Sequence, residues 1–466
     1  MADTIIGPAR RLGRVEFVTL LAMSMSLAAL GIDLMLPAFE QMRADLGLDP
    51  GATEMAGTVT AYFIGLAVGQ FLYGPLADRY GRRPALYLGY GIYGIGALAA
   101  AVSPTLEILL LSRVLWGLGA AGPAVVTRAV IRDTFEGDQM SRAMSMIVAV
   151  FILVPVIAPS IGAAAITIMS WRWLFVGCVG ATAIMALWAR RLPETLHPTD
   201  RLPLRLGRIG RAAGSVLTNR QALLYTLALT ALYSVFTSYV ASSENIFVGV
   251  FDQARLFPVI FGGLAGTIGL SMLVNARIVR TVGTLRLAHL VLIGYLVLAA
   301  ALVTVAVLTD GRPPLWLFLV GMAAMLSAHA LLIPNFTTIA LAPLGHIAGT
   351  ASSVVGGIQL GIGASLGLLL DRTFDGSVLP LSLGFLGYGL VALGLVLTAE
   401  RGKLFGQLAG RQTPAAPAQL SPSPVTSADR ADRPTPEAGT MSGALHSCHA
   451  SERSGAEHVH RAHRPD

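Results

Sequence analysis

Two charged residues lie inside long apolar stretches of the sequence and are its first candidates for chemistry. Asp33 lies in the stretch 17–39 and Arg113 in the stretch 105–126. A charge in the middle of a membrane-spanning helix costs at least about 2.5–3.5 kcal/mol, so each should face other helices and have a partner. At a rise of about 1.5 Å per residue, the two lie about 9 and 12 Å from the nearer helix end. They could therefore pair directly or through water.

The chemistry expected of this pair is reversible proton binding at Asp33. A low dielectric favours the neutral carboxyl, whereas a nearby guanidinium favours the carboxylate, so a change in access to water would shift the balance. The alternative is a static ion pair that only stabilises the fold. The two residues alone leave both interpretations open.

A short link with the sequence GPLADRYGRRP, residues 74–84, is the next candidate. Gly74 and Gly81 are expected to allow close packing or a positive φ, because glycine has no Cβ. Arginines at a membrane surface can reach the headgroups, and the link holds three of them: Arg79, Arg82 and Arg83. A basic surface loop does not explain the aspartate among these arginines.

Asp78 is that aspartate, and it needs a partner. A carboxylate is stabilised at a helix N-terminus. An apolar stretch on the same side of the membrane begins at GTASS, residues 349–353, where Thr350 or Ser352 could cap a helix. We predict that Asp78 contacts this helix start and latches two halves of the chain together when the site faces outward.

The composition indicates which elements hold these residues. Of the 466 residues, 54% are apolar and 13% are charged, whereas soluble domains average about 25% charged. A helix needs about 20 mostly apolar residues to cross a bilayer. Stretches of this kind are found at 17–39, 55–77, 85–103, 105–126, 143–169, 173–189, 221–243, 256–275, 287–308, 315–340, 351–370 and 380–399. They are too long and uniformly apolar for barrel strands, so the sequence predicts an all-α membrane protein with twelve transmembrane helices.

The arginines and lysines indicate the orientation of these helices. With twelve crossings both termini lie on one side, and 27 of the 33 Lys and Arg residues fall in the segments on that side, against five on the other. The positive-inside rule then predicts cytoplasmic termini. The net charge of +7 is therefore attributed to membrane topology and not to nucleic-acid binding.

The most basic loop divides the apolar stretches into two groups of six. The predicted parts are a cytoplasmic segment 1–16, an N-terminal six-helix bundle 17–191, a basic linker 192–220, a C-terminal six-helix bundle 221–400 and a tail 401–466. A weak internal repeat supports the division, since Gly74 to Gly81 has the same spacing as Ala276 to Gly283. The tail beyond about residue 410 is rich in Pro, Ser, Thr, Ala and His and is expected to be disordered.

Three motifs resemble those of the major facilitator superfamily. The link 74–84 resembles its signature loop, and LLLSRVLWGLGAAG, residues 109–122, resembles its second motif around a buried arginine. The segment PVIAPSIGAA, residues 155–164, is similar to the motif of proton-coupled drug exporters. Pro159 and Gly162 match that motif, whereas Ala158 and Ala163 replace its glycines. Pro155 and Pro159 each remove a backbone donor and should bend their helix.

Further segments resemble the bicyclomycin/chloramphenicol-resistance branch, Bcr/CflA, of the drug:proton antiporters. They are LGIDLMLPAF at 30–39, Arg132 with Asp133, and Pro193, Glu194 and Thr195. The resemblance covers about residues 17–400. It implies a multi-pass protein of a bacterial cytoplasmic membrane that exports small amphiphilic compounds, such as phenicol antibiotics, in exchange for protons. It also implies a single chain without a cofactor, with Asp33 and Arg113 in substrate and proton coupling.

Other polar and aromatic residues would line a central cavity in such a fold. Aromatic walls suit apolar or cationic compounds. The candidates are Tyr62, Tyr233, Phe236, Tyr239, His329, Asn335 and Gln359. Ordinary helix packing explains most aromatics of this kind, and a buried neutral imidazole is the alternative for His329. Glu244, at the end of its apolar stretch, is expected to meet water, and the alternative is that it lines the exit of the cavity.

The sequence also excludes several classes of function. It has no GxxxxGK[ST] loop for ATP hydrolysis and no metal-ligand pair on a helix. The irregularly spaced histidines of the tail are not expected to bind a metal. The first rival is an uptake symporter for a small nutrient, such as an organic acid or nucleoside. A non-transporting membrane sensor would need damaged coupling residues, whereas Asp33, Asp78 and Arg113 are all present.

Overall fold

The computed structural model describes residues 12–201 and 206–405, and in this part of the chain the regular elements are helices. The predicted tail from residue 406 onward lies outside the described residues. The α-helices are α1 (Arg14–Asp33), α2 (Phe39–Asp45), α3 (Ala56–Tyr80), α4 (Arg82–Ala101), α5 (Leu106–Thr134), α6 (Gly137–Ile166), α7 (Arg172–Trp188), α8 (Leu206–Thr218), α9 (Arg220–Glu244), α10 (Phe257–Val282), α11 (Thr284–Leu308), α12 (Leu315–Leu341), α13 (Ala348–Asp371) and α14 (Leu379–Ala399).

Twelve of the described segments are long and apolar enough to cross a membrane. They are α1 with its continuation into α2, α3 to α7 and α9 to α14, and each coincides with one of the predicted apolar stretches. Many large apolar side chains on them are exposed, such as Ile95, Ile161 and Leu270. Exposed apolar surface of this extent is suited to lipid. The predicted all-α membrane fold is confirmed.

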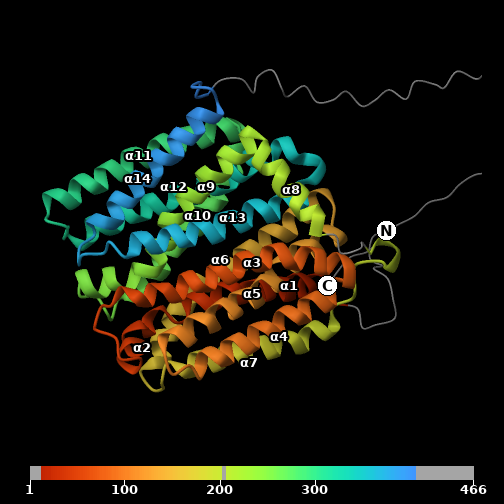
Figure 1. Cartoon of the computed structure of the whole chain (residues 1–466), viewed down its shortest axis with the longest axis horizontal. Coiled ribbons are helices and arrows are strands. Elements are labelled where there is room, and N and C mark those ends of the chain that lie inside the picture. Colours follow the sequence, from red (N-terminus) through yellow and green to blue (C-terminus); the bar gives the residue numbers. More distant parts are fainter. Residues whose placement is uncertain (1–11, 202–205, 406–466) are drawn as a thin grey trace, which may run out of the picture. The chain divides into compact units, whose positions relative to one another are not determined.

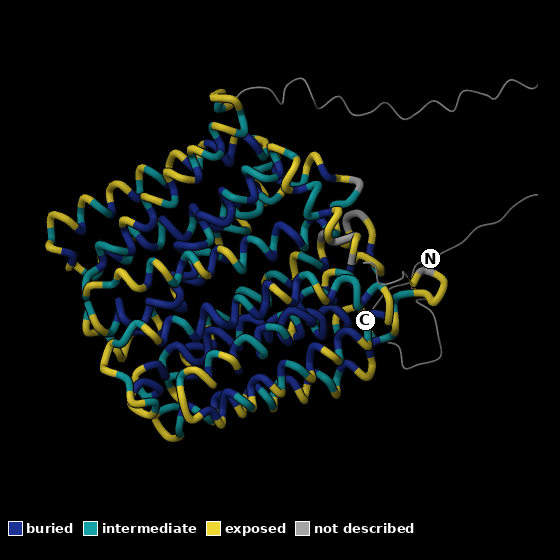
Figure 2. Tube along the Cα trace, in the orientation of Figure 1, coloured by how far each residue is buried: buried dark blue, intermediate teal, exposed yellow. Residues whose placement is uncertain are grey.

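The helices form two groups of six spans. Figure 1 shows α1 to α7 together and α9 to α14 together, and the groups meet where α3 packs against α13 and α6 against α10. The most buried spans are α3 and α9, whereas α6 and α11 present most of their surface outward. Figure 2 shows the same distribution, with buried segments inside and exposed ones around them. Residues on α3 and α9 are therefore placed to act between the halves.

Glycines let α3 and α5 approach closely in the first half. A Cβ at Gly65 of α3 would overlap the carbonyl oxygen of Val114, and a Cβ at Gly117 of α5 would overlap that of Tyr62. In lipid no hydrophobic effect drives helices together, so they associate through close van der Waals packing, which small residues allow. This contact therefore helps to fix the position of α5. Arg113 lies on α5 one turn before Gly117 and is positioned by the same contact.

We expect Gly65→Ala to destabilise the protein markedly, because the added methyl group meets backbone that cannot move aside. Overpacking of this kind costs about 1–3 kcal/mol. Gly91 of α4 is the matched control, since a Cβ there meets nothing within 4 Å. Thermal unfolding of the purified proteins in detergent should show a lower midpoint for Gly65→Ala and little change for Gly91→Ala. Equal midpoints would contradict the packing argument.

Three local predictions differ from the structure. The first predicted helix is not continuous, because α1 ends at Asp33 and a 3₁₀ turn, Leu36–Ala38, leads into α2. Gly74 lies inside α3 with open space around its Cβ position, so neither close packing nor a positive φ explains it, whereas Gly81 has the expected positive φ of 107°. The linker contains helix α8, which packs on α13 and was not predicted.

Candidate functional site

Arg113 is buried in the first half and is held by backbone carbonyls and aromatic rings. Its Nη1 donates to the carbonyl of Gly31 at 2.7 Å and its Nε to that of Thr58 at 3.2 Å. The guanidinium carbon lies 4.4 Å from the ring centroid of Tyr62 and 4.7 Å from that of Trp116. Cation–π contacts and carbonyl acceptors together compensate a buried positive charge without a carboxylate.

Asp33 is buried near this arginine but is not paired with it. It is 6% exposed, and the described residues include no hydrogen bond or ion pair of its carboxylate. The direct form of the expected pairing is therefore absent, because Arg113 donates instead to the carbonyl of Gly31, two residues earlier. The 3₁₀ turn Leu36–Ala38, which begins three residues after Asp33, contacts α9 of the second half. Asp33 thus lies where the halves meet.

Gly162 of the third motif lies against the helix end at Asp33. A Cβ at Gly162 of α6 would overlap the carbonyl oxygen of Leu34, the residue after Asp33. The structure therefore brings together two sites that the sequence treated separately. The prolines of the same motif, Pro155 and Pro159, lie inside α6, which is continuous through both.

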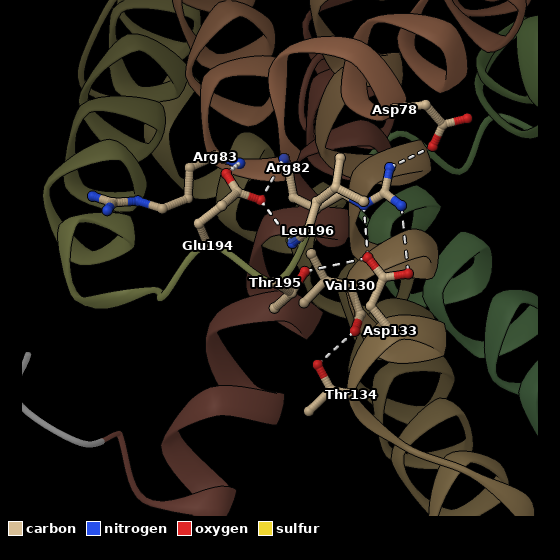
Figure 3. A network of polar contacts seen from close by, with 9 residues as sticks. All are labelled: Asp78, Arg82, Arg83, Val130, Asp133, Thr134, Glu194, Thr195 and Leu196. Atoms are coloured by element: carbon tan, nitrogen blue, oxygen red, sulfur yellow. Dashed lines mark hydrogen bonds and ion pairs between the residues drawn. The ribbon is translucent and has the colours of Figure 1, made fainter. Parts of the chain in front are cut away.

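A cluster of charged residues surrounds Arg82 at the arginine-rich face, the side that holds the link between α3 and α4. Arg82 Nε donates to Asp133 Oδ2 at 2.7 Å, and its Nη1 donates to Asp78 Oδ1 at 2.6 Å. Figure 3 shows Arg82 between these two carboxylates. Thr195 also donates to Asp133, at 3.3 Å. We call Asp78, Arg82, Asp133, Glu194 and Thr195 the Arg82 cluster.

Glu194 occupies the N-terminus of α4, whereas Asp78 was predicted to lie at another helix start, the one at 349–353. Its carboxylate accepts from the backbone N–H groups of Arg82 and Arg83, at 2.8 and 3.0 Å, at the first turn of α4. These N–H groups have no partner within the helix, and the positive end of the helix dipole favours an anion there. Glu194 therefore ties the end of the first half to its signature loop. Of the link's other arginines, Arg79 lies over the ring of Tyr80.

The predicted contact of Asp78 with the start of α13 is not formed in this structure. Asp78 binds Arg82 within its own half, and α13 begins at Ala348 with Ile347 at its N-cap. Thr350 and Ser352 lie inside the helix and do not cap it.

We expect Asp133→Ala to destabilise the protein more than Asp78→Ala. Asp133 binds Arg82 through two nitrogen atoms and its side chain is 17% exposed, whereas Asp78 binds through one and is 41% exposed. The Asp133 change should cost about 1–3 kcal/mol, and the Asp78 change no more than about 1 kcal/mol. Denaturation of the two purified variants in parallel tests the order. A larger loss for Asp78→Ala would contradict it.

At the opposite, arginine-poor face an ion pair joins the two halves. Arg43 Nη2 donates to Glu244 Oε2 at 2.8 Å and to Asn245 Oδ1 at 2.6 Å. All three residues are buried, with Arg43 1% and Glu244 5% exposed. We call them the Arg43 cluster. The expectation that Glu244 meets water is wrong, because α2 of the other half covers it.

An aromatic row crosses from the first half into the second. The ring of Phe63 on α3 lies 5.9 Å from Tyr233 on α9, and Tyr233 lies 5.7 Å from Phe236. Phe236 stacks on His329 of α12 at 5.0 Å. The Nδ1 atom of His329 is buried and has no hydrogen-bond partner in the described structure. We call Phe63, Tyr233, Phe236 and His329 the aromatic row.

The remaining predicted cavity residues have separate environments. Tyr62 donates to the carbonyl of Ala28 at 3.0 Å and supports Arg113. Tyr239 stacks on Phe261, and its hydroxyl is buried without a partner among the described residues. Asn335 donates to Asn275 at 2.8 Å, and Gln359 is buried on α13. Within the described part of the chain no group of three His, Cys, Asp or Glu side chains could hold a metal ion.

The family of the chain follows from comparison with known proteins. The model of the Major Facilitator Superfamily matches residues 21–368. The chain belongs to this superfamily. The resemblance drawn from the motifs is confirmed, and membership makes the protein a transporter and not an enzyme.

Relatives within the superfamily are similar over most of the chain. The Bicyclomycin resistance protein homolog of Haemophilus influenzae is 28% identical over 76% of this chain and 88% of its own length. Multidrug resistance protein D of Escherichia coli is 28% identical over 79% of this chain and 92% of its own. The Chloramphenicol resistance protein of Pseudomonas aeruginosa is 30% identical over 79% of this chain and 87% of its own.

Solved structures of transporters share the fold. The superposition on a D-xylose-proton symporter covers 84% of this chain and 99% of the symporter chain, with a TM-score of 0.68 and 13% sequence identity. At this identity the likeness supports the arrangement of helices and carries no argument about substrate.

Proposed function

We propose that this protein exports small amphiphilic compounds across a bacterial inner membrane in exchange for protons. In this proposal the arginine-rich face and both termini are cytoplasmic, since basic loops stay on that side. The halves at 17–191 and 221–400 rock about a central site as a single chain. The names of the relatives, which refer to bicyclomycin, chloramphenicol and multiple drugs, support export of antibiotics.

The observation that carries proton coupling is the unpaired carboxyl of Asp33 at the meeting point of the halves. Carbonyls accept from Nε and Nη1 of Arg113 and two aromatic rings lie against its guanidinium, although its buried Nη2 has no hydrogen-bond partner in the described structure. Asp33 can therefore gain or lose a proton without breaking a contact of that guanidinium. A carboxylate buried without a donor is unfavourable, which favours the protonated form until the site opens to water. Access to water from one face or the other would then load or release the proton.

The aromatic row supports an aromatic or apolar substrate. Phe63 belongs to one half and the other three residues to the second, so their contact must change when the halves move apart. Stacked rings offer flat apolar surface, and His329 adds one unused polar atom. A compound with a ring and a few hydrogen-bonding groups would replace these contacts.

Transport in proteoliposomes tests the proposal. Purified protein is reconstituted with an acidic lumen, and entry of radiolabelled chloramphenicol or bicyclomycin is measured. If the protein exchanges the compound for protons, the labelled compound should accumulate in the vesicles above the level reached without a pH difference. This accumulation should disappear when a protonophore is added. Accumulation driven by an alkaline lumen would indicate symport, and a rate indifferent to the pH difference would refute proton coupling.

A further inference from the structure

Asp371, the last residue of α13, is a second buried acid that the proposed coupling does not use. It is 3% exposed, and its Oδ1 accepts hydrogen bonds from Ser238 and Ser242 of α9, each at 2.5 Å. Its Oδ2 is buried and has no hydrogen-bond partner in the described structure. No described Arg, Lys or His forms an ion pair with it. Two donors therefore hold one oxygen, and the other is free to carry a proton.

Opposing physical effects act on this carboxyl. The two hydroxyl donors favour the carboxylate, because hydrogen bonds to an ionised group are the stronger ones. Burial disfavours the carboxylate, and so does the position at the negative end of the α13 dipole. A carboxyl under such a balance can change its charge when its access to water changes.

The charged and titratable groups around Asp371 are few. The helices packed against α13 include α3, α8, α9, α12 and α14. On α14, the hydroxyl of Tyr388 donates to the carbonyl of Leu366 of α13, five residues before Asp371, at 3.1 Å. On α9, Glu244 follows Ser242 by two residues and is paired with Arg43. Arg372 follows Asp371 and is exposed. The polar groups of α3 in the Arg82 cluster lie at the other face, and on α12 His329 stacks on Phe236.

The segment of α9 that binds Asp371 also closes the Arg43 cluster. Ser238 and Ser242 lie on the last two turns of α9, and Glu244 ends the helix. Asn245 then begins a π-helix, Asn245–Val250. Such turns are rare and occur often at functional sites. A change in the hold of α13 on α9 therefore acts directly on the residues that bind Arg43.

We propose that Asp371 is a second proton-binding site, loaded from the arginine-poor face, and that proton binding there loosens the Arg43 cluster. A hydronium ion gives its proton to Oδ2 and leaves as water, so one O–H bond breaks and one forms. Neutral Asp371 replaces two charge-assisted hydrogen bonds by weaker neutral ones. The end of α9 is then released from α13, and Glu244 can leave Arg43. Proton binding stands independently of the proposed function, whereas its role in transport rests on that function.

Infrared difference spectra between high and low pH test proton binding, since they report protonated carboxyl groups in the purified protein. Asp371→Asn should remove one carboxyl band, and Asp33→Asn should remove another. The variant Ser238→Ala/Ser242→Ala keeps the acid but removes its donors, so the Asp371 band should titrate about 1 pH unit higher. If the spectra of Asp371→Asn are the same as those of the parent chain, the proposal is overturned. If Asp371→Asn does not fold, the serine variant decides, and an unchanged titration midpoint of its carboxyl band would overturn the proposal. Loss of the Asp371 band alone would refute the role of Asp33 and leave this site standing.

Spin labels test the link to the Arg43 cluster. Asp49→Cys and Ala254→Cys place labels at exposed positions of the two halves on the arginine-poor face, in a chain that also has Cys178→Ser and Cys448→Ser. The distance between the two labels should be longer when the arginine-poor face is open. As the pH falls, a larger fraction of the protein should show this longer distance. In Asp371→Asn, which is neutral at every pH, the longer distance should predominate throughout. A pH-independent distribution in the parent chain, or an unchanged one in the variant, would overturn the link.

Discussion

Arg43→Ala should shift the protein strongly toward a state that is open at the arginine-poor face. The change leaves Glu244 buried beside Asn245 without its cation, while Glu244 is 5% exposed in the closed state. Breaking one member of a buried ion pair costs about 3–5 kcal/mol. Because opening lets Glu244 meet water, this cost falls on the closed state alone. The ratio of open to closed protein should rise by a factor between about 10² and roughly 4 × 10³.

The label pair at positions 49 and 254 measures this shift directly. Glu40→Ala is the matched control, because Glu40 also binds Arg43, at 2.9 Å, but is 56% exposed and lies in the same half. Its loss should cost no more than about 1 kcal/mol and leave the label distances nearly unchanged. Equal effects of the two variants would mean that burial and the contact between halves are not what closes this face.

A second variant separates charge from packing. In Arg43→Ala/Glu244→Gln the buried carboxylate is replaced by a neutral amide of similar shape, so the closed state no longer holds an unpaired charge. The label distances should return part of the way to those of the parent chain. If the double variant stays as open as Arg43→Ala, lost packing of the arginine side chain is the dominant effect.

The fold was predictable because membrane helices are specified locally. Each needs its own run of apolar residues, and all twelve runs were found at their places in the structure. Local reasoning failed where the chain breaks a helix for a special purpose. The first apolar run passes Asp33 without interruption, yet α1 ends at that residue, with Pro37 in the following 3₁₀ turn.

The charged contacts were harder to predict because they join distant parts of the chain. Arg43 and Glu244 are 201 residues apart in the sequence, and each alone resembles an ordinary loop charge. The rule that a carboxylate belongs at a helix N-terminus was sound, but several acids and several helix starts compete on the arginine-rich face. Glu194, 112 residues from Arg82, takes the N-terminus of α4, and Asp78 binds Arg82 instead of the predicted start of α13.

Asp371 shows a further limit of sequence reasoning. It ends an apolar stretch and is followed by Arg372, so the pair looks like the start of a polar loop. A signal existed in α9, where Ser238 and Ser242 lie one helical turn apart and face one side. Two hydroxyls on one face of a membrane helix need an acceptor, although the sequence does not say which one.

Asp33→Asn should abolish transport driven by a pH difference while preserving exchange of substrate for substrate. The amide has nearly the same shape as the carboxyl but cannot bind and release a proton at physiological pH, so the step that couples proton movement to reorientation is lost. Substrate exchange needs only the loaded protein to reorient. Arg113 should keep its position, because its partners are carbonyls and rings.

Proteoliposomes separate these two activities, with one preparation given a pH difference and the other loaded with unlabelled chloramphenicol at equal pH on both sides. Asp45→Asn is the control, since Asp45 is an acid of the same half whose side chain is 44% exposed and binds Arg172. It should retain pH-driven transport. Full pH-driven transport by Asp33→Asn would refute the assignment, and it would leave Asp371 as the buried acid that couples protons to the movement of the two halves.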